Sequence, residues 1–170
     1  MMHPNTGGRL DMADLVIIRD GRVKDSGKAL PVWFEFMEYH MRISTMDFEM
    51  LSSAGENWRK FFEKNVRSRV RKAIVAEYNG QIIGFLLGTI EKRPPVFARS
   101  LQAYVDSIGV LDTWKKQGIG TMLLNTFEKW AREMGMPFIM LNVVVENDPA
   151  IHLYEKLGYK TVILSQRKLL

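Results

Sequence analysis

The clearest candidate for chemistry in the sequence is one short segment that contains two glycines, Lys115-Lys116-Gln117-Gly118-Ile119-Gly120-Thr121. It lies between a predicted strand and a predicted helix, where unpaired backbone amides and the positive end of the helix dipole favour an anion. Glycines let a phosphate approach the backbone closely, and two lysines add positive charge. The segment therefore favours a pyrophosphate ligand, although an ordinary loop-to-helix junction has the same residue types.

Two common phosphate-binding motifs do not match this segment. The dinucleotide-binding fingerprint requires a third glycine where the chain has Leu123, and no acidic residue is suitably placed after the next predicted strand. The nucleotide-binding P-loop requires Gly-Lys followed by Ser or Thr, and the sequence contains no such triplet. Both motifs are therefore excluded.

With its flanks, the segment resembles the acetyl-CoA motif of the GNAT (Gcn5-related N-acetyltransferase) superfamily. The preceding stretch Tyr104-Val-Asp-Ser-Ile-Gly-Val110 is similar to the central strand of that family. The later stretch Asn147-Asp-Pro-Ala-Ile-His-Leu-Tyr-Glu-Lys-Leu-Gly-Tyr159 is similar to its second cofactor motif. The resemblance implies an enzyme that transfers the acetyl group of acetyl-CoA to a primary amine of a small molecule or a protein, by direct attack in a ternary complex.

The resemblance also implies which residues bind acetyl-CoA. The backbone of Ile108, Gly109 and Val110 would bind the pantetheine amides, as an added strand would. Lys115 lies where the family has Gln or Arg, so it keeps a charge but lacks the planar fork of an arginine. Asn147 would contact the cofactor. The cradle for the phosphates would consist of Lys116, Gln117, Gly118, Ile119, Gly120 and Thr121.

Acetyl transfer to an amine requires a neutral amine, a polarised carbonyl and a proton for the departing thiolate. The resemblance gives Tyr154 the role of general acid. Without the resemblance, Tyr154 would be interpreted as a helix residue that packs its ring. Asp106 is the candidate proton acceptor, through a water relay, with an exposed or ion-paired strand aspartate as the alternative. Glu35 and Glu38 would orient a cationic amine, or would form a solvated helix face.

The elements that position these residues follow from hydrophobic periodicity and turn residues. Strands are predicted over 15–19, 72–77, 81–90, 103–111, 137–146 and 159–170, and helices over 29–43, 56–70, 118–133 and 148–157. The nearly continuous apolar run 137–146 is typical of a strand buried on both faces. The fold class is therefore α/β: a GNAT-like three-layer domain, with a central mixed, mostly antiparallel twisted sheet of about six strands flanked by about four helices.

Composition limits the other possibilities. The chain has 170 residues, of which 46% are hydrophobic, and this length suits one domain over 13–170 after an N-terminal extension over 1–12. The absence of cysteine excludes disulfides and thiolate chemistry and fits a cytoplasmic protein. The longest apolar run, 82–90, is too short to cross a membrane. The three histidines lack suitably spaced ligand neighbours, so no metal is expected.

The sequence says less about the binding partners and the acceptor than about the cofactor. The net charge of +5 is spread along the chain, so no nucleic-acid partner is expected. Only twelve residues follow Gly158, where many members of the family have two final strands, and we expect a homodimer to cover the short sheet edge. The acceptor stays open among protein amino termini, lysines, polyamines, amino acids and aminoglycosides. A non-catalytic acyl-CoA-binding module on the same fold is the alternative.

Overall fold

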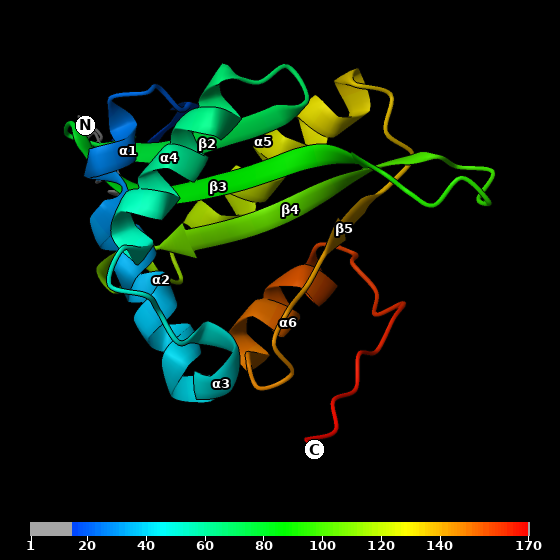
Figure 1. Cartoon of the computed structure of the whole chain (residues 1–170). Helices are drawn as coiled ribbons and strands as arrows, with labels where there is room; N and C mark the ends of the chain where they lie inside the picture. Colours follow the sequence, from blue (N-terminus) through cyan, green and yellow to red (C-terminus); the bar gives the residue numbers. More distant parts are fainter. Residues whose placement is uncertain (1–14, 170) are drawn as a thin grey trace, which may run out of the picture.

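The computed structural model describes residues 15–169 and is built on one five-stranded sheet (Figure 1). Neighbouring strands pair antiparallel from β1 to β4, and β5 lies parallel to β4. The predicted mixed, mostly antiparallel sheet is confirmed, with five strands in place of about six. In spatial order the strands are β1 (Ile17–Asp20), β2 (Arg71–Tyr78), β3 (Gln81–Lys92), β4 (Leu101–Val110) and β5 (Ile139–Leu141).

Helices cover both faces of the sheet, which gives three layers (Figure 1). Successive residues of a strand point to opposite faces. On β3, the ring of Phe85 contacts Phe36 and Trp58 on one side, whereas Gly84 faces Leu123 on the other. The first face is covered by α2 (Leu30–Ile43) and α4 (Ala54–Arg67) and the second by α5 (Ile119–Glu133); the remaining helices are α1 (Asp25–Lys28), α3 (Thr45–Phe48) and α6 (Asp148–Lys156).

A β-bulge in β4 divides the sheet. Val105 pairs with Gly88 of β3 and Ser107 pairs with Leu87, so Asp106 has no partner in the ladder. On its other side, β4 pairs with β5 only as far as Val105, which lies opposite Leu141. Beyond the bulge, and within residues 15–169, β4 pairs with β3 alone. The two halves of the sheet therefore separate at Asp106.

Two strand predictions were wrong in extent. The strand expected over 137–146 is only Ile139–Leu141, and its residues are half-buried rather than buried on both faces. The strand expected over 159–170 is absent from its described part, 159–169. The reason is the same in both cases. A strand requires a neighbour for its hydrogen bonds, and β5 loses its partner at the bulge while nothing in 15–169 pairs with its outer edge.

The long helices were predicted closely. Those expected over 29–43, 118–133 and 148–157 match α2, α5 and α6 within a residue. The helix expected over 56–70 begins two residues earlier and ends at Arg67, because Ser68 is already extended. The short helices α1 and α3 were not predicted. The N-terminal extension expected over 1–12 lies outside the described residues.

Candidate functional site

The candidate site lies where β4 and β5 separate, next to the N-termini of α5 and α6. Beyond the bulge, the edge of β4 that faces away from β3 has no strand partner among the described residues. Ile108, Gly109 and Val110 lie on this stretch, so their backbone groups on that edge are available to a ligand that pairs as a strand does. The resemblance implies such a binding mode for these three residues, and their role as cofactor ligands stays a prediction.

The glycine turn provides an uncapped helix start beside this edge. Gly118 is the N-cap residue of α5 and has a φ of 81°, in the left-handed region that favours glycine. No side chain among residues 15–169 caps this helix, so the amides of Ile119, Gly120 and Thr121 keep their hydrogen-bonding capacity. A Cβ built at Gly120 would lie 3.2 Å from Leu153 of α6. The turn thus presents free amides close to α6.

One of the two lysines of the turn pairs with a carboxylate, so the net positive charge at the turn is lower than the sequence alone predicts. Lys115 Nζ lies 2.5 Å from Asp112 Oδ1 and 5.1 Å from the centre of the Tyr39 ring. Both charged side chains are about half exposed, so this ion pair is screened by solvent and contributes little to stability. Lys116 is exposed with a φ of 61°. Both lysines therefore stay accessible to an anion at the turn.

Helix α2 connects the two cofactor motifs through side chains one turn apart. Glu35 Oε2 accepts a hydrogen bond of 2.8 Å from the amide of Asp112, at the start of the loop that leads to the glycine turn. The Tyr39 hydroxyl donates to Asn147 Oδ1 at 3.3 Å. Asn147 is the buried N-cap of α6, and its Oδ1 also accepts from the amide of Ala150 at 3.3 Å.

These contacts change the interpretation of α2. Glu35 has a backbone partner at the glycine turn, whereas Glu38 is exposed to solvent. Their expected role in orienting an amine stays a prediction. Tyr39 was missed by sequence reasoning, although its position four residues after Glu35 places both on one helix face.

Tyr154 is buried in α6, with 9% of its surface exposed. Burial raises the pKa of its hydroxyl to about 12, because desolvation disfavours the phenolate. Its ring centre lies 5.8 Å from that of Tyr159. The phenol is therefore protonated at neutral pH, the form that a proton donor requires.

Asp106 is the polar group at the bulge. Burial raises the pKa of Asp106 to about 6, the guanidinium of Arg71 opposes this, and the charge of Glu91 raises the pKa further. Arg71 Nη1 lies 3.9 Å from Asp106 Oδ2, at the limit of an ion pair. Glu91 Oε1 also accepts a hydrogen bond of 2.6 Å from Gln102. Both predicted interpretations of Asp106, a proton acceptor and an ion-paired aspartate, fit this geometry.

These features suit a ligand that contains a phosphopantetheine chain, which has both amides and phosphate. The open edge of β4 matches a chain of amides, and the uncapped start of α5 matches phosphates; the role of Tyr154 stays a prediction. Within residues 15–169, no cluster of three or more His, Cys, Asp or Glu side chains is arranged to hold a metal ion. In the same part of the chain, no helix combines the length and the apolar character needed to cross a membrane.

Comparison with known proteins agrees with this geometry. The model of the acetyltransferase (GNAT) family matches residues 34–159. An N-alpha-acetyltransferase from Sulfurisphaera tokodaii is 35% identical over 109 residues, which are 60% of this chain and 64% of that protein. An N-alpha-acetyltransferase from Sulfolobus acidocaldarius is 29% identical over 142 residues, which are 75% of this chain and 83% of that protein.

A solved structure extends the likeness to the fold. The crystal structure of a mutant of the BH1408 protein from Bacillus halodurans superposes with a TM-score of 0.82, at 20% identity. The match covers 91% of this chain and 99% of that one. At this identity the likeness concerns the fold alone.

The hydrogen bond between Tyr39 and Asn147 generates the first prediction. Tyr39→Phe keeps the aromatic ring beside Lys115 but removes the hydroxyl that donates to Asn147. The hydrogen bond that joins α2 to the second cofactor motif is then lost. A hydrogen bond contributes about 0.5–1.5 kcal/mol, so we expect acetyl-CoA to bind about 2- to 10-fold more weakly, as measured by isothermal titration calorimetry.

Ser26→Ala is the control for this prediction. It removes a hydroxyl that donates a hydrogen bond of 3.1 Å to Glu63 Oε1, between α1 and α4. Equal affinities of the Tyr39→Phe variant and the wild type would contradict the role given to Tyr39.

Proposed function

Because the chain belongs to the GNAT family of acetyltransferases, we propose that it transfers the acetyl group of acetyl-CoA to a primary amine by direct attack in a ternary complex. One observation carries the proposal: β4 and β5 separate at the bulge and leave the backbone of 108–110 open beside the uncapped start of α5. A ligand with both a strand-like amide chain and phosphates suits this combination.

The proposed binding mode uses mainly the backbone. Ile108 and Val110 exchange hydrogen bonds with the pantetheine arm at the open edge of β4. The amides at the start of α5, from Ile119 to Thr121, hold the pyrophosphate, and Lys115 adds a charge that can turn from Asp112 to a phosphate. Asn147 supports this arrangement from α6, where Tyr39 fixes its side chain.

The proposed chemistry assigns one proton transfer to each of two side chains. Acetyl-CoA supplies an acetyl group that is activated as a thioester. Asp106 accepts, through water, the proton that the amine loses as its nitrogen bonds to the carbonyl carbon. Tyr154 donates its phenolic proton to the sulfur as the carbon–sulfur bond breaks. Backbone amides of β4 near Ile108 polarise the carbonyl oxygen.

We propose the α-amino group of a polypeptide as the acceptor. Two relatives, at 35% and 29% identity, are named N-alpha-acetyltransferases. The carboxylate of Asp106 lies at the bulge, and the nearby charge of Glu91 raises its pKa. These carboxylates attract an ammonium group, which releases its first proton to solvent so that the neutral amine can attack.

The proposal is tested with acetyl-CoA that carries a labelled acetyl group. The acceptors are a peptide with a free amino terminus and the same peptide with a blocked amino terminus and one lysine. We expect label in the first peptide only. Tyr154→Phe should lower kcat by about 100-fold, the typical contribution of a proton donor, while the affinity for acetyl-CoA stays unchanged.

Other outcomes of this assay have distinct meanings. Label in a polyamine, an amino acid or an aminoglycoside, but not in the free amino terminus, would contradict the α-amine acceptor while keeping the enzyme. Binding of acetyl-CoA without transfer to any of these amines would favour a non-catalytic acyl-CoA-binding module.

The pKa of Asp106 generates a pH prediction. Because the pKa is raised to about 6, the carboxylate takes up a proton below this pH and can no longer accept one from the amine. We expect kcat/KM to fall as the pH drops through about 6. Asp106→Asn should lose this acidic limb and be about 100-fold slower at neutral pH.

Glu91→Gln provides the comparison for the pH profile. Since the charge of Glu91 raises the pKa of Asp106, its removal should move the acidic limb to lower pH without abolishing activity. A limb near pH 6 that persists in Asp106→Asn would refute the assignment of this titration to Asp106.

A further inference from the structure

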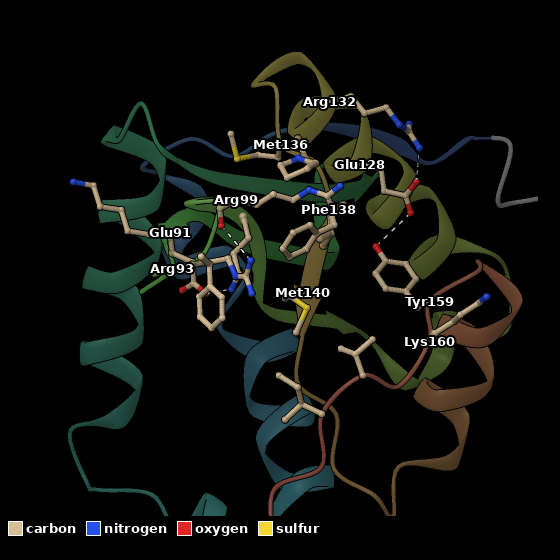
Figure 2. A pocket seen from close by; sticks show the side chains of 18 of the residues that line it. Glu91, Arg93, Arg99, Glu128, Arg132, Met136, Phe138, Met140, Tyr159 and Lys160 are labelled. Atoms are coloured by element: carbon tan, nitrogen blue, oxygen red, sulfur yellow. Dashed lines mark hydrogen bonds and ion pairs between the residues drawn. The ribbon is translucent and has the colours of Figure 1, made fainter. Parts of the chain in front are cut away.

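Within residues 15–169, two buried polar side-chain atoms lack a hydrogen-bond partner: Trp58 Nε1 and Asn65 Oδ1. Neither residue lines the groove of about 1020 Å³ along β5. In that groove, Figure 2 shows Glu128 paired with both Arg132 and the Tyr159 hydroxyl, so this carboxylate already has its partners. Asn65 instead lines a second cavity, of about 140 Å³. The unsatisfied acceptor directs attention to this smaller cavity.

The smaller cavity lies where the C-terminal end of α4 meets the end of β1 and the start of β2. Trp130 of α5 closes it from the other face of the sheet. Its volume equals that of about four or five water molecules, so it suits a small ion. Its polar lining consists of Asp20, Asn65, Ser68, Arg69, Arg71 and Lys72.

Asn65 contributes an acceptor to this cavity. The residue is only 1% exposed, and its Nδ2 donates a hydrogen bond of 2.9 Å to the carbonyl oxygen of Phe61. Because a carbonyl oxygen only accepts, this contact fixes the orientation of the amide and leaves Oδ1 without a partner among the described residues. A buried acceptor of this kind requires an N–H or O–H donor.

Three cations line the same cavity, against one carboxylate. Lys72 Nζ lies 2.8 Å from Asp20 Oδ2, so these two charges balance. Arg69 is exposed and forms no ion pair within residues 15–169, and Arg71 reaches only the limit of an ion pair with Asp106. The last turn of α4 has basic residues of its own, so the helix dipole does not account for these arginines. The excess positive charge suits an anion.

The acceptor and the excess cations together define the chemistry of a ligand. An ammonium group could donate to Asn65 Oδ1, but the arginines would repel it. Sulfate and the phosphodiesters of nucleic acids would satisfy the arginines, but they present only acceptor oxygens to Oδ1. A phosphate ion is negatively charged and keeps an O–H, so it meets both requirements.

We propose that the cavity between the end of α4 and the start of β2 binds a phosphate group that retains an O–H, either as the free ion or on a small monoester. The O–H donates to Asn65 Oδ1, while Arg69 and Arg71 donate to the other oxygens of the phosphate.

Arg71 connects this cavity with the bulge of β4. Burial raises the pKa of Asp106 to about 6, the charge of Arg71 opposes this, and the charge of Glu91 adds to it. Tyr104, whose pKa is raised by burial, is neutral beside them. A bound phosphate competes for the Arg71 guanidinium and therefore raises the pKa of Asp106 further. The effect on catalysis rests on the proposed role of Asp106, whereas phosphate binding does not.

Isothermal titration calorimetry with inorganic phosphate and with sulfate tests the site. At about pH 8 both anions are mainly doubly charged, but only phosphate has an O–H. We expect one phosphate per chain, bound about 10- to 100-fold more tightly than sulfate. Absence of phosphate binding, or equal affinities for the two anions, would overturn the proposal, because water would then satisfy Asn65 Oδ1.

Two matched variants locate the phosphate, since the glycine turn also attracts anions. Arg69→Gln and Lys116→Gln each remove one exposed positive charge, the first at the cavity and the second at the glycine turn. Arg69→Gln should weaken phosphate binding about 10-fold, and Lys116→Gln should leave it unchanged. The reverse result would place the phosphate at the glycine turn and overturn the proposal, without affecting the proposed binding of acetyl-CoA.

Asn65→Ala tests the acceptor directly. It removes Oδ1, so the affinities for phosphate and sulfate should become equal, and the melting temperature shows whether the variant is folded. A folded variant that still prefers phosphate about 10-fold or more would contradict the role of Asn65.

Glycerol 3-phosphate distinguishes the two sources of the phosphate group. At about pH 6, a substantial share of its phosphate keeps an O–H. Binding tighter than that of inorganic phosphate would assign the site to a phosphorylated small molecule, and weaker binding would assign it to the free ion.

The connection through Arg71 is measured by carbon-13 NMR of the Asp106 carboxyl group. Its titration midpoint should lie near pH 6 without phosphate and higher at saturating phosphate. A midpoint that phosphate leaves unchanged would contradict the competition for Arg71.

Discussion

The arrangement of the molecule depends on one constraint, the loss of pairing between β4 and β5 at the bulge of Asp106. A strand keeps two neighbours only while its register is continuous, and the extra residue at 106 bends β4 away after Val105. The backbone of 108–110 then keeps hydrogen-bonding groups that no strand uses. The same separation limits β5 to three residues. The candidate site and the open outer edge of β5 are thus two consequences of a single irregularity.

Helix α2 makes contacts on both sides of the point where β4 and β5 separate. Glu35 accepts from the Asp112 amide on the side of β4, and Tyr39 donates to Asn147 on the side of α6. Single hydrogen bonds of this kind contribute about 1 kcal/mol each, so their effect is on geometry more than on stability. They fix the distance between the glycine turn and the start of α6, and a ligand that touches both depends on this distance.

Sequence reasoning succeeded where the signal is local. The helices expected over 118–133 and 148–157, which match α5 and α6, follow from residues within a few positions. It failed where the outcome depends on a distant partner. The segments 137–146 and 159–170 were both predicted as strands, but within 15–169 only Ile139–Leu141 has a strand to pair with. Likewise, nothing local indicates that Tyr39 lies beside Asn147, 108 positions along the chain.

The central claim, that the open edge of β4 and the uncapped start of α5 together bind acetyl-CoA, is tested most directly by nuclear magnetic resonance. Amide resonances of the isotopically labelled protein are followed as acetyl-CoA is added. We expect saturable shifts at the amides of Ile108, Val110 and Ile119 to Thr121. Saturable binding that leaves the amides of 108–110 and 119–121 unchanged would contradict it.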